Sequence, residues 1–454
     1  MAFIRSISGI RATLGDGLVP SELAKYIAAF LNIMPNGKIV IGNDGRPSAT
    51  WITDLAVSIC KSMNREAIDI GLATTPTVQL ISEIDGCVGG IAITASHNPG
   101  NWNGLKFIGA NGIFLDADEN QKLWELVDNN QVIFPNEYKY SEIDFYKEAN
   151  SYHINYILKS NLISNKKVLE SIKDKNYSAV VDAVNASGSY VVPNLLDKLN
   201  VKCHRLYCEG NGSFPHPPEP IPEHLGELAN AVKEKNADLG IAVDPDGDRL
   251  VLIDEHGVAI GEEKTIALCV KYVLSKKDII PGENAIVVNL STSMMSEIIA
   301  KEYGAKIYYS KVGEINVVKK MKEINACFGG EGSGGVILPI VHYGRDSLVG
   351  IGIILSLMAN EGKTLSQLAA DLPSLTMIKT KKEFSGDLAP LLEKFEAEFT
   401  DYNDLDKQDG LKFKFENSWL QIRSSNTEPI IRIMAEAKTE EEANSLIERA
   451  KELI

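Results

Sequence analysis

The sequence predicts an α/β protein with three similar βαβ-type, mixed-sheet domains followed by a smaller α+β domain. Three observations support this class. A chain of 454 residues is too long for a single hydrophobic core. Apolar runs bounded by Gly or Asn alternate with helical periodicity along most of the chain, as they do where parallel strands are buried beneath helices. The third observation is a pattern of runs and loops that occurs three times.

Each copy of this repeat begins with a strand-like run that enters a small polar loop and then a helix. The runs are GKIVIGNDGRPSA (37–49), YSAVVDAVNASGS (177–189) and ENAIVVNLSTSMM (283–295). A second apolar run follows in each copy, at 66–76, 201–212 and 305–314. A third run then ends in an unusual loop, which is ITASHNP (93–99), DPDGDR (244–249) or GGEGSGG (329–335). Because ligands bind beyond the carboxyl ends of strands in open α/β sheets, we expect the three loops to face one cleft.

The last part of the chain has a different pattern. A helical segment, APLLEKFEAEF, is followed by the strand-like segments LKFKFE, SWLQIRSS and IIRIMAEA and by the closing helix TEEEANSLIERAKELI. The Asp- and Asn-rich stretch 400–410 is predicted to be a hairpin-like loop rather than a linker. The predicted domains are therefore 1–150, 151–256, 257–369 and 370–454.

Composition excludes several classes of function. The formal net charge is −15 and there is no dense Lys/Arg cluster, so we expect no nucleic-acid partner. No apolar run approaches the roughly 20 residues needed to cross a bilayer, and from the start MAFIRSISGIR we expect no secretory signal. The six cysteines are scattered without a C-x-x-C pair, as in a reduced cytoplasmic protein. An anionic ligand would have to be attracted locally, by arginines and a metal ion.

The loop DPDGDR carries three alternating carboxylates, Asp244, Asp246 and Asp248. Alternate residues of a curved loop can converge on a hard cation that prefers oxygen ligands, which predicts a Mg²⁺ site. An EF-hand calcium loop is disfavoured because Arg249 stands where that loop requires glycine and a strand-like run precedes it. A solvated acidic turn remains the simple alternative. Arg249 would suit a phosphate beside the metal.

The segment RSSNTEPIIR has the composition of an anion site. Successive backbone N–H groups in such a turn can form an anion-binding nest, and Arg432 follows on the next strand. A capped turn would explain the Asn and Thr but not two arginines that bracket Glu428 and Pro429. The predicted phosphate-binding residues are Arg423, Ser424, Ser425, Asn426 and Thr427.

Two further loops carry single reactive groups. GGEGSGG has one acid, Glu331, and one hydroxyl, Ser333, but neither the lysine nor the spacing of a P-loop, and so suits the hydroxyl groups of a sugar. Ser96 in ITASHNP lacks the G-x-S-x-G elbow, and His97 is too near in sequence to settle a triad. Alone, Ser96 would be read as a turn residue. Because the same chain also contains a predicted metal loop, phosphate loop and sugar loop, phosphoryl transfer on Ser96 is the favoured interpretation.

Taken together, TASHNP, DPDGDR, GEGSGG and RSSNTEP resemble the four signature loops of the α-D-phosphohexomutase family, in order and over essentially the whole chain. This family includes phosphoglucomutases, phosphomannomutases and phosphoglucosamine mutases. The resemblance implies four domains around a central cleft, with Ser96 as the phosphoserine carrier and Glu331 and Ser333 on the sugar hydroxyls. It also implies one Mg²⁺ per chain, held by Ser96, Asp244, Asp246 and Asp248.

Smaller matches complete the implied site. NPGNWNGLKF carries Lys106 where the family has a lysine suited to proton transfer, and His97 or Arg249 would assist it. SGIRAT supplies Arg11, and YGRD supplies Arg345. There are departures as well. Ala12 stands where many members have glycine, and Asn43 stands where arginine is common, although Arg46 remains available.

The implied activity is interconversion of hexose 6-phosphate and hexose 1-phosphate through phosphoserine and a bisphosphate intermediate, with hexose 1,6-bisphosphate as activator. GEGSGG with HYGRD looks closest to members often labelled phosphoglucosamine mutase, so glucosamine 6-phosphate is the expected substrate. Glucose or mannose phosphates are the alternative. A phosphatase, in which water attacks phospho-Ser96, and a sugar-phosphate binding module are the competing classes. The protein is expected to act as a monomer or homodimer.

Overall fold

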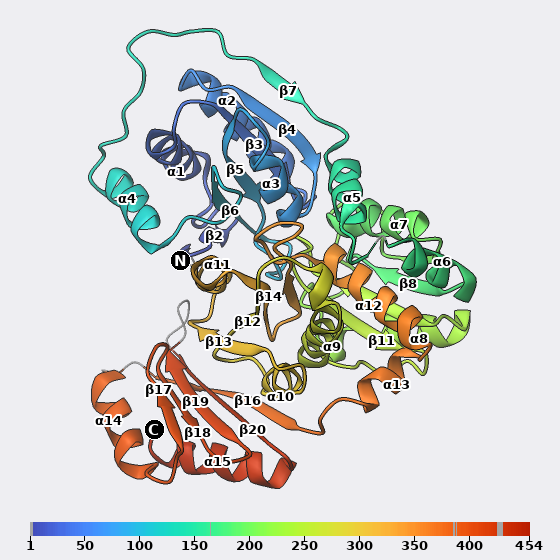
Figure 1. Cartoon of the computed structure of the whole chain (residues 1–454). Coiled ribbons are helices and arrows are strands. Elements are labelled where there is room, and N and C mark those ends of the chain that lie inside the picture. The colour runs from blue at the N-terminus through green and yellow to red at the C-terminus, as the bar shows by residue number, and fades with distance from the viewer. Residues whose placement is uncertain (1–2, 164, 385, 387, 425–429) are drawn as a thin grey trace.

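The computed structural model describes residues 3–163, 165–384, 386, 388–424 and 430–454. Four sheets of seven, four, four and five strands organise these described residues. In Figure 1 the first sheet is blue at the top, the second green on the right, the third yellow in the centre and the fourth red at the bottom. The predicted class, three mixed α/β domains and a smaller C-terminal domain, is confirmed.

The first domain contains the first copy of the repeat. Parallel strands β3, β4 and β5 are joined by helices, and β6 returns antiparallel to β5, in the order β1-β2-β6-β5-β3-β4-β7. The elements are β1 (Phe3–Ser6), β2 (Gly9–Thr13), α1 (Pro20–Ile33), β3 (Lys38–Asn43), α2 (Ala49–Ser62), β4 (Ala67–Leu72), α3 (Thr75–Ser82), β5 (Cys87–Ile93), β6 (Trp102–Gly109), α4 (Ala117–Asp128) and β7 (Ile143–Phe145).

The second and third domains repeat the same connectivity. Their sheets have the orders β11-β10-β8-β9 and β15-β14-β12-β13, each with one antiparallel strand beside three parallel ones. The second contains α5 (Ala149–Lys159), α6 (Lys166–Lys175), β8 (Ser178–Asp182), α7 (Gly188–Lys198), β9 (Lys202–Leu206), α8 (Gly226–Lys235), β10 (Leu239–Val243) and β11 (Leu250–Asp254). The third contains α9 (Glu262–Ser275), β12 (Glu283–Asn289), α10 (Met295–Glu302), β13 (Lys306–Ser310), α11 (Glu314–Ile324), β14 (Ala326–Glu331), β15 (Gly335–Ile337), α12 (Ser347–Glu361) and α13 (Leu365–Ala370).

Helix α12 joins the cores of the second and third domains. It is apolar around its whole circumference and buried from Ser347 to Ala359, as expected for a helix packed on all sides. Its neighbours include α6 and α9, and the buried side chains of both domains form one continuous cluster. The second and third sheets are therefore held in a fixed relation by apolar burial.

The C-terminal domain is an antiparallel sheet in the order β16-β20-β19-β18-β17. One face packs its apolar side chains against α14 and α15. The opposite face carries polar residues, and we call it the docking face: Lys379, Lys412, Gln421 and Glu436. The elements are β16 (Thr376–Glu383), α14 (Leu388–Glu398), β17 (Asp404–Asp406), β18 (Leu411–Lys414), β19 (Trp419–Ser424), β20 (Ile430–Ala437) and α15 (Glu440–Glu452).

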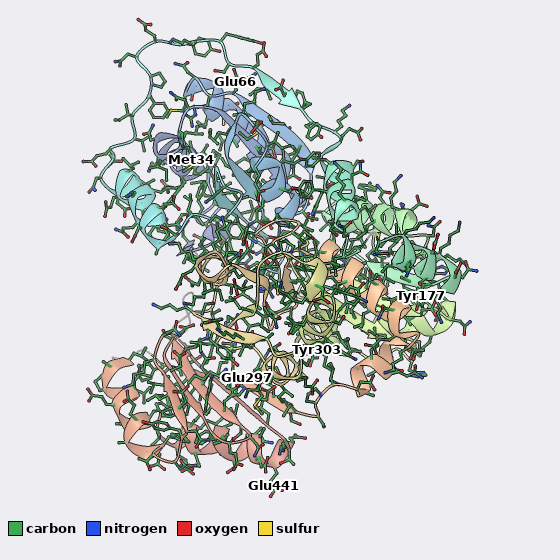
Figure 2. The ribbon with its side chains drawn as sticks, viewed as in Figure 1. Met34, Glu66, Tyr177, Glu297, Tyr303 and Glu441 are labelled. Atoms are coloured by element: carbon green, nitrogen blue, oxygen red, sulfur yellow. The ribbon has the colours of Figure 1, made fainter. Side chains whose placement is uncertain are left out.

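The predicted helices and the last three strands of this domain are found, and β17 and β18 form a hairpin within and after the predicted loop 400–410. Figure 2 places Glu297 of α10 beside the C-terminal domain, whereas Glu441 of α15 lies on its outer side. Among the described residues, no helix has the length and apolarity that a bilayer span requires.

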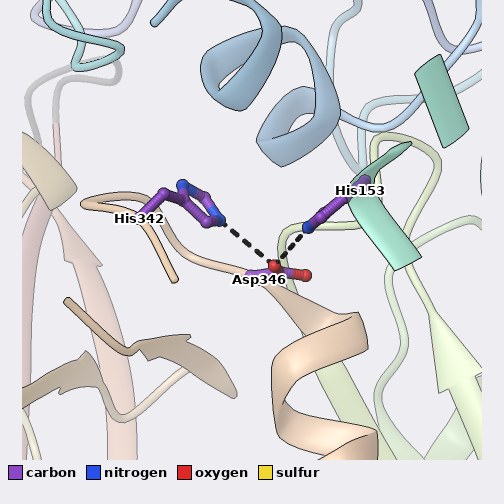
Figure 3. Close-up of side chains that lie close together, drawn as sticks. All are labelled: His153, His342 and Asp346. Atoms are coloured by element: carbon purple, nitrogen blue, oxygen red, sulfur yellow. Dashed lines mark hydrogen bonds and ion pairs between the residues drawn. The ribbon is translucent and has the colours of Figure 1, made fainter. Parts of the chain in front are cut away.

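A buried cluster joins the first three domains where α3, α5 and α12 approach one another (Figure 3). His153 Nε2 and His342 Nε2 lie 2.8 and 3.1 Å from Asp346 Oδ2. Asp346 Oδ1 caps α12 by accepting from backbone N–H groups, and Thr77 Oγ1 lies 2.9 Å from His153 Nδ1. Because the carboxylate is so fully hydrogen-bonded, we assign the cluster to the joint between domains.

Candidate active site

The loop that carries Ser96 follows β5 and is held in an unusual conformation. Ser96 has φ of +49°, in the left-handed region that residues other than glycine rarely adopt. Its backbone N–H donates to Thr94 Oγ1 at 2.8 Å, and that hydroxyl donates to Asp44 Oδ2 at 2.7 Å. Strained backbone of this kind persists where its surroundings fix it and is concentrated at functional sites.

Arg46 is the main support of this loop. Its guanidinium is fully buried and pairs with Asp44 Oδ2 at 2.9 Å. It also donates to the carbonyl oxygens of Ser96 at 2.5 Å, Asn98 at 2.8 Å and Pro99 at 2.6 Å. Arg46, which the sequence left available without a role, is thus occupied in fixing the position of Ser96.

The aspartate loop lies between β10 and β11. Strands on both sides exclude the helix–loop–helix frame of an EF-hand. Side chains from three domains hold it. Thr75 Oγ1 of α3 donates to Asp246 Oδ2, Ser187 Oγ donates to the carbonyl of Pro245, and Ser347 Oγ of α12 donates to that of Gly247, each at 2.7 Å.

The serine and aspartate loops meet directly. Ser96 Oγ donates to Asp244 Oδ2 at 2.9 Å, across 148 residues of sequence. Lys106, on β6, reaches the same loop, and its Nζ lies 2.5 Å from Asp246 Oδ2 and 3.2 Å from Asp248 Oδ2. Five of the predicted residues therefore share one buried contact region.

The three aspartates fit a divalent cation. One carboxylate oxygen from each lies within 4.8 Å of the others, and all three residues are buried. Asp246 Oδ1 and Asp248 Oδ1 are buried without a hydrogen-bond partner in the described part of the chain. Burial, with the like charges of its two neighbours, raises the pKa of Asp244 well above its ordinary value. A hard cation would give the unpaired oxygens a partner and relieve this repulsion, which fits Mg²⁺.

Lys106 and His97 have opposite electrostatic surroundings. Burial disfavours the charged form of Lys106, but Asp246 and Asp248 outweigh it and raise the pKa of its amine. His97 Nδ1 lies 3.4 Å from Ser96 Oγ. The charge of Arg249, together with burial, lowers the pKa of this imidazole well below its ordinary value. Lys106 is therefore a cation at neutral pH, and His97 is neutral.

The arginines surround this centre. Arg249 Nε lies 3.9 Å from carboxylate oxygens of both Asp244 and Asp248. Arg11, on β2, donates to Asn98 Oδ1 at 3.0 Å, and burial followed by the charge of Arg249 lowers the pKa of its guanidinium. Both arginines thus lie close to the Ser96 loop.

Arg345 links the aspartate loop to the third domain. Its guanidinium lies 2.6 Å from Asp248 Oδ2, 2.7 Å from Glu331 Oε2 and 3.2 Å from Glu314 Oε2. Gly335 is needed beside it, because a Cβ there would come within 2.3 Å of the Arg345 side chain. Arg345 therefore joins the predicted metal loop to the predicted sugar loop.

Glu331 and Ser333 lie at the end of β14 and in the turn that follows. Glu331 is buried, and its Oε1 accepts from Asn289 Nδ2 at 2.7 Å and from the Gly313 N–H at 2.9 Å. Ser333 is half-buried in the turn to β15. The structure thus places Glu331 in a network that fixes its orientation.

Arg423 and Arg432 face each other on β19 and β20. The two residues are directly opposite in the antiparallel register, so their like charges lie side by side. Such a pair is destabilising unless an anion or acid compensates it. Arg423 Nε is buried and makes no hydrogen bond within the described residues. Ser424 is exposed at the end of β19, whereas Ser425, Asn426 and Thr427 lie outside the described residues.

Glu263 lies against the sugar loop and has an unusual proton affinity. Its carboxylate accepts from the Ser293 N–H and pairs with Lys379, and a Cβ on Gly332 would come within 2.4 Å of both its oxygens. Burial raises its pKa from an ordinary 4.5 to about 7, against the opposing charge of Lys379.

We expect Glu263→Gln to change how stability depends on pH. The folded protein binds this proton more tightly than the unfolded chain, so the stability that protonated Glu263 contributes is full below about pH 4.5 and lost as the pH rises through 7. The raised pKa of Glu263 corresponds to a change of about 3 kcal/mol in the free energy of unfolding across this pH range. Thermal unfolding of both proteins between pH 4.5 and 8.5 measures it. The wild type should lose stability relative to Glu263→Gln as the pH rises, and parallel curves would contradict this assignment.

Several residues of the site belong to none of the four motif loops. They are the first residues of α3 and α11, Thr75 and Glu314, and the last residue of β12, Asn289. Only folding brings them next to the motif loops. The repeat does place 74–75 and 313–314 after the second strand of their units. Comparison of the three copies is therefore the signal that could have found them.

Family comparisons agree with this architecture. Four models described as phosphoglucomutase/phosphomannomutase match consecutive parts of the chain: alpha/beta/alpha domain I at residues 4–133, domain II at 153–257, domain III at 261–375 and the C-terminal domain at 378–453. The chain therefore belongs to the phosphoglucomutase/phosphomannomutase family. It is a phosphohexomutase and thus an intramolecular phosphotransferase.

Individual relatives extend over nearly the full length. A "Phosphoglucomutase/phosphomannomutase" from Thermococcus kodakarensis is 34% identical over 98% of this chain and 97% of that protein. A "Probable phosphoglucosamine mutase" from Methanopyrus kandleri is 31% identical over 97% and 95%. A solved phosphoglucomutase/phosphomannomutase family protein from Burkholderia thailandensis has a TM-score of 0.83 at 24% identity, covering 98% of this chain and 95% of that one, and supports the fold.

Proposed function

We propose that the protein converts glucosamine 6-phosphate to glucosamine 1-phosphate by way of phosphorylated Ser96 and a hexose bisphosphate. One observation carries the route. Ser96 Oγ lies 2.9 Å from a carboxylate of a buried aspartate triad, two of whose oxygens make no hydrogen bond within the described residues. A hydroxyl in hydrogen-bond contact with a cation site is where a phosphoryl group can be held and transferred.

Each loop contributes a different group to the proposed phosphoryl transfer. A Mg²⁺ ion on Asp244, Asp246 and Asp248 would supply Lewis-acid stabilisation of negative charge. In the first transfer the bond between phosphorus and Ser96 Oγ breaks, a bond from phosphorus to the sugar oxygen forms, and the sugar hydroxyl proton passes to the protein. In the second transfer the bond between the 6-phosphate phosphorus and its sugar oxygen breaks, the bond to Ser96 Oγ forms again, and the proton returns to the sugar oxygen. Lys106 stabilises the charge that develops, and His97, being neutral, can accept the proton.

The remaining residues are proposed to bind the substrate. The facing pair Arg423 and Arg432 supports a phosphate site that Ser424, Ser425, Asn426 and Thr427 would complete. Glu331 and Ser333 are assigned to the sugar hydroxyls, and Arg11, Arg249 and Arg345 to the charge around the transferring group. One loop then comes from each of the proposed domains 1–150, 151–256, 257–369 and 370–454.

The identity of the sugar is the finer part of the proposal. A relative 31% identical to this chain carries a name that specifies glucosamine, whereas one at 34% names glucose and mannose mutases. The alternative is therefore phosphoglucomutase/phosphomannomutase activity on the same residues. We further propose a cytoplasmic monomer or homodimer with one Mg²⁺ per chain and hexose 1,6-bisphosphate as activator.

A parallel substrate assay tests the proposal. The purified protein, with Mg²⁺ and trace glucose 1,6-bisphosphate, is offered glucosamine, glucose and mannose 6-phosphates. We expect kcat/KM for glucosamine 6-phosphate to exceed the other two by at least about tenfold, since a site that pairs a substrate amine rejects analogues lacking it. A higher value for glucose or mannose 6-phosphate would establish the alternative. Release of inorganic phosphate without a 1-phosphate product would indicate a phosphatase.

A further inference from the structure

The docking face of the C-terminal domain contacts one short loop of the third domain, residues 289–294. Glu436 accepts from the Ser293 hydroxyl, and its Oε2 accepts from the Met294 N–H at 2.8 Å. Lys412 Nζ donates to the carbonyl oxygen of Leu290 at 2.5 Å. Glu436 and Lys412 are each only 1% exposed, so these contacts are removed from water.

Glu436 of the C-terminal domain caps the N-terminus of α10 in the third domain. Met294 is the N-cap residue of α10, and its side chain makes no capping hydrogen bond. The carboxylate of Glu436 occupies that place, and Trp419 Nε1 donates to the same Oε2 at 2.8 Å. A negative charge at a helix N-terminus is stabilising, so undocking the domain would leave α10 uncapped and would remove the two partners of Glu436 in the third domain, Ser293 and Met294.

The other side of the same loop holds the sugar loop. Asn289 Nδ2 donates to Glu331 Oε1 at 2.7 Å, and the Gly332 N–H donates to Thr292 Oγ1 at 3.0 Å. The Thr292 hydroxyl in turn donates to Asn289 Oδ1 at 3.0 Å, which closes the loop on itself. Six residues thus bind the docking face on one side and Glu331 on the other.

A second contact runs in parallel. Asp409 of the C-terminal domain accepts from the Val312 N–H at 3.1 Å, and the adjacent Gly313 N–H donates to Glu331 Oε1. Both groups that hold Glu331 Oε1 therefore belong to loops that the C-terminal domain touches.

We propose that loop 289–294 is a relay that places Glu331 only when the C-terminal domain is docked, with Glu436 as its positioning residue. Docking fixes Ser293 and Met294, and the closed loop transmits this to Asn289 and Thr292. The sugar loop then takes its place in the same event that brings the Arg423 strand to the site. The kinetic consequence rests on the proposed function, whereas the structural one does not.

Amide hydrogen exchange tests the structural part without any substrate. Glu436→Ala should speed exchange at least about tenfold in the peptides covering 289–294 and 329–335. Glu436→Gln keeps an acceptor for the N–H groups and should stay within about threefold of the wild type. Thr439→Ala is the matched control, because it removes the N-cap of α15 in the same domain, away from the interface. It should leave both peptides unchanged.

Kinetics test the coupling. Glu436→Ala and Asn289→Ala should each lower kcat/KM about tenfold. Because both substitutions interrupt the same chain of contacts, kcat/KM of the double variant should be no more than about threefold below that of the less active single variant. A double variant that loses the product of the two effects would overturn the relay. The relay would also be overturned if Glu436→Ala speeds amide exchange at 289–294 but leaves the exchange rate at 329–335 unchanged. Absence of mutase turnover in the wild type would instead refute the proposed function and leave the exchange result standing.

Discussion

Replacing Ser96 with alanine is expected to lower kcat by at least about 10⁴-fold while leaving the fold intact. The variant removes the one oxygen that can carry the phosphoryl group, and no other hydroxyl in the described residues is seen to contact Asp244. The backbone at φ +49° is held by Thr94 and Arg46, so its conformation does not depend on the hydroxyl. Steady-state assays with glucosamine and glucose 6-phosphates measure the loss.

Ser189→Ala is the matched control for this prediction. Ser189 is also buried, and its hydroxyl makes no hydrogen bond within the described part of the chain. Its removal should leave both turnover and the melting temperature unchanged. Retention of near-normal mutase activity by Ser96→Ala, at the wild-type melting temperature, would refute the assignment of Ser96 as carrier.

Replacing Arg46 with methionine is expected to cost both stability and activity. The variant leaves the Asp44 charge and three loop carbonyl oxygens without their buried donor, which should lower the free energy of unfolding by roughly 3–5 kcal/mol. Because Ser96 is placed by these bonds, kcat/KM should also fall at least about 10²-fold, as it does when a reacting group is displaced by about 1 Å. Calorimetry and assays of the folded protein measure the two effects separately.

Arg65→Met provides the comparison for Arg46→Met. Arg65 is buried in the same domain and donates to Asn36 Oδ1 and to the carbonyl oxygens of Met34 and Pro35, away from the serine loop. The Arg65→Met variant should lose about as much unfolding free energy as Arg46→Met, and its kcat/KM should stay within about threefold of the wild type. If the two variants lose activity equally, general destabilisation explains the loss and Arg46 has no specific role in placing Ser96.

The sequence was sufficient for the repeat because the physics behind it is local. Buried parallel strands require uninterrupted apolar runs, and the unusual loops stand where those runs end. All three copies and the last three strands of the C-terminal domain follow from this pattern. Strand β16 was not predicted, because six of its eight residues are polar or charged and it contains no apolar run longer than two residues.

The supporting residues of the site could not be predicted in the same way. Arg46 looks like a free arginine until burial shows that its donors are used on backbone carbonyls. His153 lies far in sequence from His342 and Asp346, and it meets them only in the folded chain. Glu436 lies in a strand whose pattern tells which side it faces but not that another domain covers it. Motifs identify the groups that react, whereas their positions depend on long-range packing.

Transfer of a phosphoryl label tests the central claim most directly. The protein is incubated with Mg²⁺ and hexose 1,6-bisphosphate labelled with ³²P, freed of small molecules, and then given unlabelled glucosamine 6-phosphate. The account predicts label on the peptide that contains Ser96 and its quantitative passage into a hexosamine bisphosphate. An unlabelled Ser96 peptide, or label that leaves only as inorganic phosphate, would contradict it.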